Sequence, residues 1–201
     1  VGKLTMNYST IENADNAGRL WNPNDWKMRG GMIYASSSFF KNNRRDVEFM
    51  AFENHYNSGP NAGQVAPYRS AFYKCDFIID QNYLFDVKPP RDAMVTLWQV
   101  RGIDFNGCDF KNISGQSLNK AGIYSWDADY TVKEWCNQYP CTTPVQSHVI
   151  GLKAGIDATS SGLGYGLMVD TTNFISCDYG VVDDGLQHAV ITRISVIIAA
   201  S

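Results

Sequence analysis

A short motif recurs along the chain and limits the fold more than any other feature of the sequence. Its pattern is Phe-x-x-Cys-Asp followed by Phe or Tyr, and its copies contain Cys75, Cys108 and Cys177. A looser frame of apolar, small and Asn positions adds copies around Ser9 and Ser38. Because neighbouring copies lie about 30 residues apart, with a longer interval before Cys177, the sequence predicts a stack of similar units.

Within each copy, apolar and polar residues alternate, which is typical of strands that bury one face. The step from Phe105 to Cys108 breaks this alternation, so we expect a corner at Asn106 and Gly107, where glycine permits the bend. A unit of short bent strands cannot bury its own apolar face and must stack on its neighbours. The sequence therefore predicts an all-β parallel β-helix, a solenoid of about six or seven coils.

Equivalent residues of successive coils should lie one above another. The expected ladders are the small side chains Cys75, Cys108 and Cys177, the aromatic rings Phe77, Phe110 and Tyr179, and the corner residues Asn13, Asn42 and Asn112. Asn suits a corner because it tolerates left-handed backbone angles. Residues 54–69, 83–91 and 133–147 exceed what a compact coil needs, and we expect them as long loops on one side of the stack.

Composition supports a folded core and excludes several classes of protein. Hydrophobic residues make up 44% of the 201 residues and charged residues 18%, which excludes a disordered chain. The net charge is −3 and the basic residues are scattered, so we expect no nucleic-acid surface. Apolar runs are too short for a membrane-spanning segment. The histidines lie in unrelated contexts, and we expect no metal and no cofactor.

The chain has five cysteines, so they cannot all pair with one another. Cys136 and Cys141 enclose the polar segment Asn-Gln-Tyr-Pro, a spacing that is weak for zinc and fits a small loop disulfide. We expect the other three cysteines to be reduced packing residues. A disulfide favours an oxidising, extracytoplasmic location.

We expect residues 1–201 to form one domain. Val196 and Ala199, near one end, fit the same frame as Phe105 and Cys108. Both ends would then lie inside coils, and the chain would be a segment of a longer solenoid in a larger multidomain protein.

These repeats resemble a known group of proteins. The residues that carry the resemblance are residues 2–14, 40–49 and 101–112, followed by Gly122-Ile-Tyr-Ser-Trp-Asp-Ala. They are similar to the right-handed parallel β-helix repeats of the pectin-lyase-like superfamily, and more narrowly to Bacteroidota surface proteins exported by the type IX secretion system. The resemblance implies a right-handed β-helix and a secreted or cell-surface location.

The superfamily's enzymes act on polysaccharides with carboxylates and basic residues placed in separate coils. Here Asp183 and Asp184 form the best acidic pair and could act as general acid and base. His188 and Arg193 also resemble residues of the enzymes' motifs, but these two residues and the two aspartates all lie within one short segment. A solvated turn is the competing interpretation, and it is the one we favour for Asp183 and Asp184.

A second candidate site contains Tyr124, Trp126, Asp127 and Asp129. Alternation would place Asp127 and Asp129 on one outward face beside Trp126, as a cation site or a sugar contact. Two carboxylates are few ligands for calcium, so an exposed polar strand end is the interpretation that we favour. With Trp135 and Tyr139, these aromatic residues could instead stack on a glycan or cover the disulfide loop.

Two function classes follow. The leading hypothesis is a non-enzymatic, adhesin-like scaffold, cargo of the type IX secretion system, that binds a surface or dietary polysaccharide. The alternative is a fragment of a carbohydrate-active enzyme, a hydrolase or lyase. A third interpretation makes components of the export machinery the relevant partners. Two acidic residues within reach of each other and of a basic residue on one sheet face would favour the enzyme.

Overall fold

The computed structural model describes residues 3–22, 24–52, 58–62, 64, 69–86, 92–162 and 164–197, with the side chains of 25–29 and 51–52 left aside. Every helix or strand assigned in these ranges is a β-strand, and the strands pair mostly in parallel. None of the described segments is a helix long and apolar enough to cross a membrane.

The parallel strands fall into three stacks, which we call sheets A, B and C. Sheet A contains β1 (Lys3–Asn7), β6 (Met32–Ser36), β9 (Ser70–Tyr73), the second half of β11 (Asp92–Asn106), β14 (Asp129–Lys133), β17 (Gly166–Asp170) and β20 (His188–Thr192). Sheet B contains β2 (Thr10–Glu12), β7 (Phe39–Lys41), β10 (Asp76–Ile79), β12 (Asp109–Asn112), β15 (Ser147–Ile150), β18 (Thr172–Ile175) and β21 (Ser195–Ile197). Sheet C contains β3 (Asn16–Arg19), β8 (Arg45–Phe52), the first half of β11, β13 (Lys120–Trp126), β16 (Ala154–Thr159) and β19 (Tyr179–Asp184).

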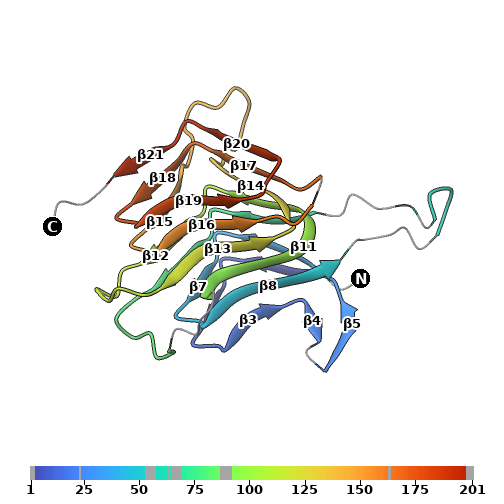
Figure 1. Cartoon of the computed structure of the whole chain (residues 1–201), viewed down its shortest axis with the longest axis horizontal. Coiled ribbons are helices and arrows are strands. Elements are labelled where there is room, and N and C mark those ends of the chain that lie inside the picture. Colours follow the sequence, from blue (N-terminus) through green and yellow to red (C-terminus); the bar gives the residue numbers. More distant parts are fainter. Residues whose placement is uncertain are drawn as a thin grey trace.

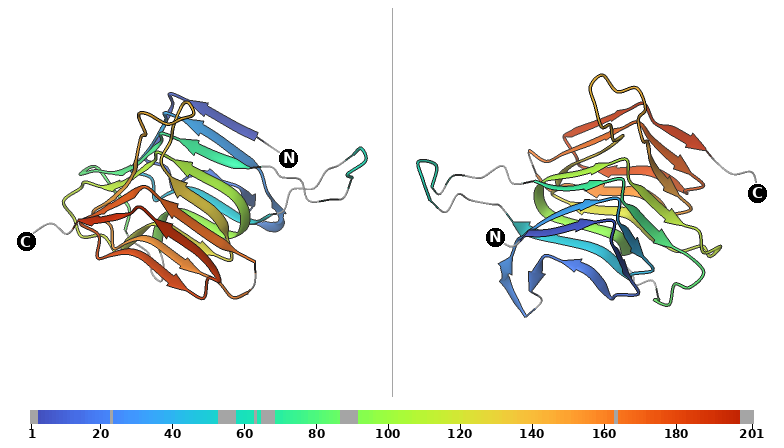
Figure 2. Two further views of the ribbon diagram at one scale, coloured as in Figure 1. Left: turned by 90° about the horizontal axis from the view of Figure 1, so that it is seen from above. Right: turned by 180° about the vertical axis from the view of Figure 1, so that it is seen from behind.

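The chain visits these sheets in a fixed order. It passes from sheet A to B to C and then returns to sheet A one strand further along, as the blue-to-red stacking of the strands shows in Figures 1 and 2. β11 bends from sheet C into sheet A, so these two sheets join into one 12-stranded sheet beside the 7-stranded sheet B. A short antiparallel pair, β4 (Trp21–Asn22) and β5 (Asp25–Arg29), follows β3.

Sharp corners between the sheets use left-handed backbone angles. The predicted corner at Gly107 has φ 61° and separates β11 from β12. Asn13 and Asn42 have φ 58° and 52° at the corner between sheets B and C. Asn112 differs from the prediction, because it ends β12 and its side chain donates a hydrogen bond to the carbonyl of Gly151, 2.9 Å away.

Phenylalanine columns fill the interior between the sheets. Phe40, Phe77 and Phe110 stack at centroid distances of 4.9 and 4.7 Å, and Phe72 stacks on Phe105 at 4.9 Å. All five rings are fully buried. Burial of aromatic rings at this density is the main source of stabilisation for such a core.

The predicted cysteine ladder is right for two of its three members. Cys75 and Cys108 are buried and free, but Cys177 is half-buried and follows β18. Phe174 pairs with Val149, which pairs with Phe110, so the Phe of the third motif copy lies in sheet B, whereas Phe72 and Phe105 of the other two copies lie in sheet A. The third copy therefore has the same residue types as the other two but lies in a different strand and at a different corner.

Ser147 and Thr172 occupy the next two positions of the ladder that contains Cys75 and Cys108. The backbone N–H of Cys108 donates to the Ser147 hydroxyl at 3.1 Å, and Ser147 pairs with Thr172 in register. The expected position of Val196 is also corrected. Val196 pairs with Phe174, so it lies in the column of Phe110 and not in that of Phe105. Ala199 lies outside the described residues.

Tyr179 does not join the interior stack of Phe77 and Phe110. It begins β19 in sheet C, opposite Ala154, and is 56% exposed.

The long insertions do not share one side. Residues 54–69 connect sheet C to sheet A, residues 83–91 lie between sheets B and C, and residues 133–147 connect sheet A to sheet B. The strands that flank the three insertions meet at three different corners of the strand stack, which differs from the expectation of one side. Residues 54–57, 63, 65–68 and 87–91 lie outside the described part of the chain.

Candidate functional site

The outer face of sheet C carries two tryptophans in adjacent strands. Val95 and Leu97 of β11 are fully buried, so Thr96 and Trp98 alternate to the outside. β11 and β13 pair in register, which places Trp98 directly opposite Trp126. Their rings are stacked, with centroids 5.5 Å apart and planes 7° from parallel.

A groove of about 390 Å³ lies on this face. Trp98 and Trp126 line it together with Trp21, Glu48, Met50, Thr96 and Tyr124. Trp98 is 38% exposed, which is high for so large an apolar side chain in a folded chain. Aromatic walls with a few polar groups are typical of sites for small organic ligands.

Glu48 holds the other end of this groove in place. Its carboxylate accepts hydrogen bonds from the Trp21 indole and the Arg19 guanidinium, each at 3.3 Å, and from Arg45 at 2.5 Å. The Arg19 guanidinium also lies 5.3 Å from the Trp21 ring centroid, within cation–π range. Trp21 is thus oriented by two charged neighbours.

Tyr124 lies at the base of the groove and not on its surface. It is 8% exposed and packs with Ala93, Ala121 and Ala154 in a small apolar cluster outside the main core. Tyr124 was expected to be an exposed sugar contact; it is instead a buried residue that supports the groove, because it packs against these three alanines.

Asp127 supports Trp126 and does not face solvent. It is 4% exposed, has φ 50°, and accepts a hydrogen bond from the Trp126 indole at 2.9 Å. The backbone N–H and hydroxyl of Ser161 donate to it at 2.7 Å each, and Ser160 donates at 3.1 Å. Burial would raise the pKa of this carboxyl, but these hydrogen bonds outweigh it and lower the pKa.

Asp129 belongs to another sheet. It begins β14 in sheet A, opposite Arg101, while Asp127 sits at the corner after β13. The left-handed turn at Asp127 breaks the alternation on which the shared outward face depended. Asp127 and Asp129 therefore share no outward face that could form a joint cation site, and the described residues contain no group of three metal-binding side chains.

Asp183 and Asp184 are both exposed at the end of β19. They pair with Ala158 and Thr159, and adjacent strand residues point to opposite faces, so the carboxylates do not converge. Asp183 accepts a hydrogen bond from the Leu186 backbone N–H at 3.0 Å, which is a turn contact. Arg193, the basic residue expected near this pair, forms its ion pair with Asp170 instead.

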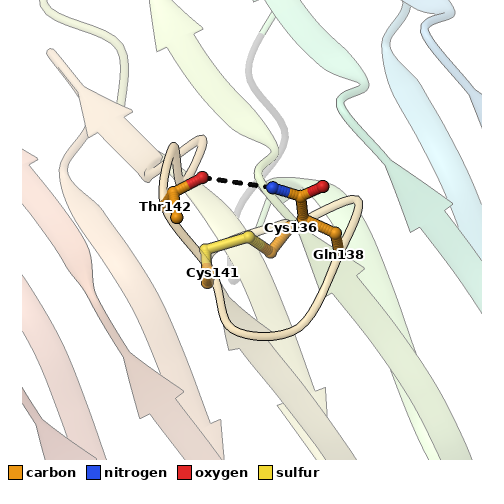
Figure 3. The surroundings of a disulfide bond; sticks show 4 residues. All are labelled: Cys136, Gln138, Cys141 and Thr142. Atoms are coloured by element: carbon orange, nitrogen blue, oxygen red, sulfur yellow. Dashed lines mark hydrogen bonds between the residues drawn. A yellow bond between two sulfur atoms is a disulfide. The ribbon is translucent and has the colours of Figure 1, made fainter.

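The disulfide loop is a separate surface. Cys136 and Cys141 are bonded, as their spacing suggested, and Gln138 donates a hydrogen bond to Thr142 at 3.3 Å (Figure 3). Tyr139, at the loop tip, is 99% exposed. This loop leaves the corner between sheets A and B, so its aromatic residues do not extend the groove on sheet C.

Trp135 packs beside this loop. The Lys74 ammonium lies 4.2 Å from the Trp135 ring centroid, and the Trp135 backbone pairs with Val145. Trp135 therefore anchors the base of the loop and covers the corner at Gly107. A Cβ added to Gly107 would lie 2.8 Å from the Cβ of Trp135.

Sequence reasoning missed Trp98, Trp21 and Glu48. A signal for Trp98 was available, because Val95-x-x-Trp98 and Ile123-x-x-Trp126 repeat the same spacing. Trp21 and Glu48 carry no such signal, since the hairpin that presents Trp21 interrupts the coil pattern.

A charged network on sheet B was also missed. Lys111 donates to Asp76 at 2.6 Å and to Asp109 at 3.0 Å, and the His148 ring nitrogen Nδ1 lies 2.8 Å from Asp109. These residues stand in adjacent strands of sheet B.

We compared the chain with protein-family models, with curated proteins and with solved structures, and found no match in any of them.

Proposed function

We propose that the chain is a right-handed parallel β-helix that serves as a secreted or cell-surface scaffold and binds a glycan. Three features support the fold: the repeated A–B–C order, the in-register parallel pairing and the columns of equivalent side chains. Right-handed crossovers between parallel strands are the strong rule in proteins, which supports the handedness. The 7-stranded sheet B supports a solenoid of up to seven coils.

Glycan binding rests on one observation, the Trp98–Trp126 stack beside the groove. A flat aromatic surface can pack against the C–H face of a sugar ring, because both are apolar and rigid. Glu48 and Thr96 add hydrogen-bonding groups along the same groove, which suits the hydroxyl groups of a sugar. Asp127 fixes the Trp126 indole, so the platform is in place before a ligand arrives.

Export is part of the same proposal. The Cys136–Cys141 disulfide supports an oxidising compartment. The resemblance of the repeats supports a Bacteroidota surface protein, cargo of the type IX secretion system and a segment of a longer multidomain chain. Components of the export machinery are then further partners. Protease added to intact source cells should degrade the protein, because it lies on the cell surface. In cells that lack the type IX secretion system, the protein should instead be protected from the protease.

Binding can be tested by titrating the protein with a panel of soluble polysaccharides. At least one should bind, and Trp98→Ala and Trp126→Ala should each weaken it by about tenfold, the loss expected for one aromatic contact. Tyr139→Ala is the matched control, because it removes an exposed aromatic ring outside the groove. No binding across the panel, or equal losses in the control, would rule the glycan site out.

The alternative is a carbohydrate-active enzyme, and the network on sheet B favours it. Asp76 and Asp109 lie on one face within reach of Lys111 and His148, which is the arrangement expected of a catalytic cleft. The competing interpretation is an ion-pair ladder, since one ammonium bridges both carboxylates. An enzyme should release reducing or unsaturated sugar ends, and Asp109→Asn should abolish that release. Asp183→Asn serves as the control outside the network.

A further inference from the structure

Lys120 is fully buried although its side chain is charged in water. It begins β13 and pairs in register with Asp92, the first residue of β11. The exposed fractions of the two side chains are 0% and 2%. The Lys120 Nζ atom lies 3.7 Å from the Asp92 Oδ1 atom, so an amine and a carboxyl meet in a site without solvent.

Two other groups fix the direction of the Lys120 amine. Nζ donates hydrogen bonds to the carbonyl oxygen of Arg44 and to the Tyr83 hydroxyl, the latter at 3.1 Å. An unprotonated amine has two N–H bonds and one lone pair. In its unprotonated form the amine would use both N–H bonds on Arg44 and Tyr83 and keep its lone pair for a third neighbour, and Asp92 is the carboxyl beside it.

Asp46 adds a second buried carboxyl to this cluster. It stands on β8, the strand that pairs with β11, and accepts a hydrogen bond from Asn43 at 2.9 Å. Burial raises the pKa of Asp46 to about 8, even though Asn43 and the charge of Lys120 lower it. Burial likewise lowers the pKa of Lys120, against the charges of Asp92 and Asp46. Burial thus shifts Lys120 towards its neutral amine and Asp46 towards its protonated carboxyl.

We propose that Lys120 and Asp92 form an intramolecular amide bond that joins β13 to β11. Asp46 passes its proton to the Asp92 carboxylate, and the Lys120 lone pair attacks Cγ of Asp92, forming the C–N bond. The proton that Nζ loses goes to the departing Asp92 hydroxyl, so the C–O bond breaks, one water leaves and Asp46 remains as a carboxylate. No oxidant or reductant is needed, because the oxidation states do not change.

This link would act independently of the groove. It closes the chain between residues 92 and 120 across β12, so the coil that contains β12 could no longer unwind. A surface scaffold that is pulled or exposed to proteases would gain resistance from such a bond.

The intact mass of the purified, reduced protein tests the proposal directly. We expect a mass lower by one water than the sequence requires, and a proteolytic fragment in which peptides containing Asp92 and Lys120 stay joined. The full sequence mass, with both peptides recovered separately, would overturn the proposal. This measurement needs no variant and so does not depend on any substitution folding.

Three substitutions test the chemistry. Asp92→Asn should still form the link but lose ammonia in place of water, whereas Lys120→Met should show the full sequence mass. Asp46→Asn keeps the size of the side chain but cannot supply a proton, so we expect an unlinked product. A link formed to the wild-type extent in Asp46→Asn would overturn the role given to Asp46.

Discussion

Phe77 and Phe110 stack face to face in the core, with ring centroids 4.7 Å apart and planes 2° from parallel. They are directly opposed in the parallel pair β10 and β12. Their separation matches the spacing between neighbouring strands, so the stack is a direct product of the register. The same register stacks Trp98 on Trp126 on the outer face.

Removing one ring from this column should destabilise the stacked strands around it. Phe110 is fully buried, and we expect Phe110→Ala to lower the free energy of unfolding by about 3–5 kcal/mol, because the cavity lies between rings that cannot close it. Leu84, 83% exposed, offers the control: Leu84→Ala should cost less than about 0.5 kcal/mol. Urea unfolding followed by fluorescence measures both, and similar losses would contradict the assigned core.

Gly155 marks a close approach between strands. A Cβ added there would meet the carbonyl oxygen of Gly180 and the Phe174 ring, each at 2.5 Å. Gly155→Ala should therefore lower the free energy of unfolding by about 1–3 kcal/mol through overpacking. Gly162→Ala is the matched substitution, since nothing lies within 4 Å of its added Cβ. A neutral Gly155→Ala would mean that β16 and β19 are further apart than described.

Stability should fall in acid through Asp80. The N–H of Asn82, the Lys41 ammonium and the Asn42 amide hold the pKa of this carboxyl at about 2, below the ordinary 3.8. A depressed pKa stabilises the fold above the ordinary value, and that contribution is lost as the pH falls from 3.8 towards 2. Asp80→Asn should lower the melting temperature at neutral pH and reduce its fall over this acidic range. An unchanged pH profile would argue against these contacts.

The three free cysteines should differ in reactivity. Cys75 and Cys108 are buried, and burial also raises the pKa of Cys108, which disfavours its reactive thiolate. Cys177 is half-buried and should react first with a thiol reagent in the native protein. Mass spectrometry of partly labelled protein can rank the sites, with urea-unfolded protein as the reference in which all three react. Early labelling of Cys75 would be incompatible with the described interior.

The sequence by itself determined the local part of this structure. Alternation predicted the strands, glycine predicted the corner at Gly107, and the spacing of Cys136 and Cys141 predicted their disulfide. Each of these depends on residues close together in the chain, where backbone geometry leaves few choices.

Only the tertiary structure decided which residues of successive parallel strands lie opposite one another. Parallel stacking joins residues about 30 apart, and insertions of unequal length at three corners prevent that register from being counted along the chain. Cys177 was therefore assigned to the wrong ladder. Asp127 and Asp129 were assigned to one face for a different reason, because the left-handed turn at Asp127 was not foreseen. For the same reason as with Cys177, Trp98 was not paired with Trp126, nor Lys120 with Asp92. Strand register brings each pair together, and the length of the intervening loop does not reveal that register.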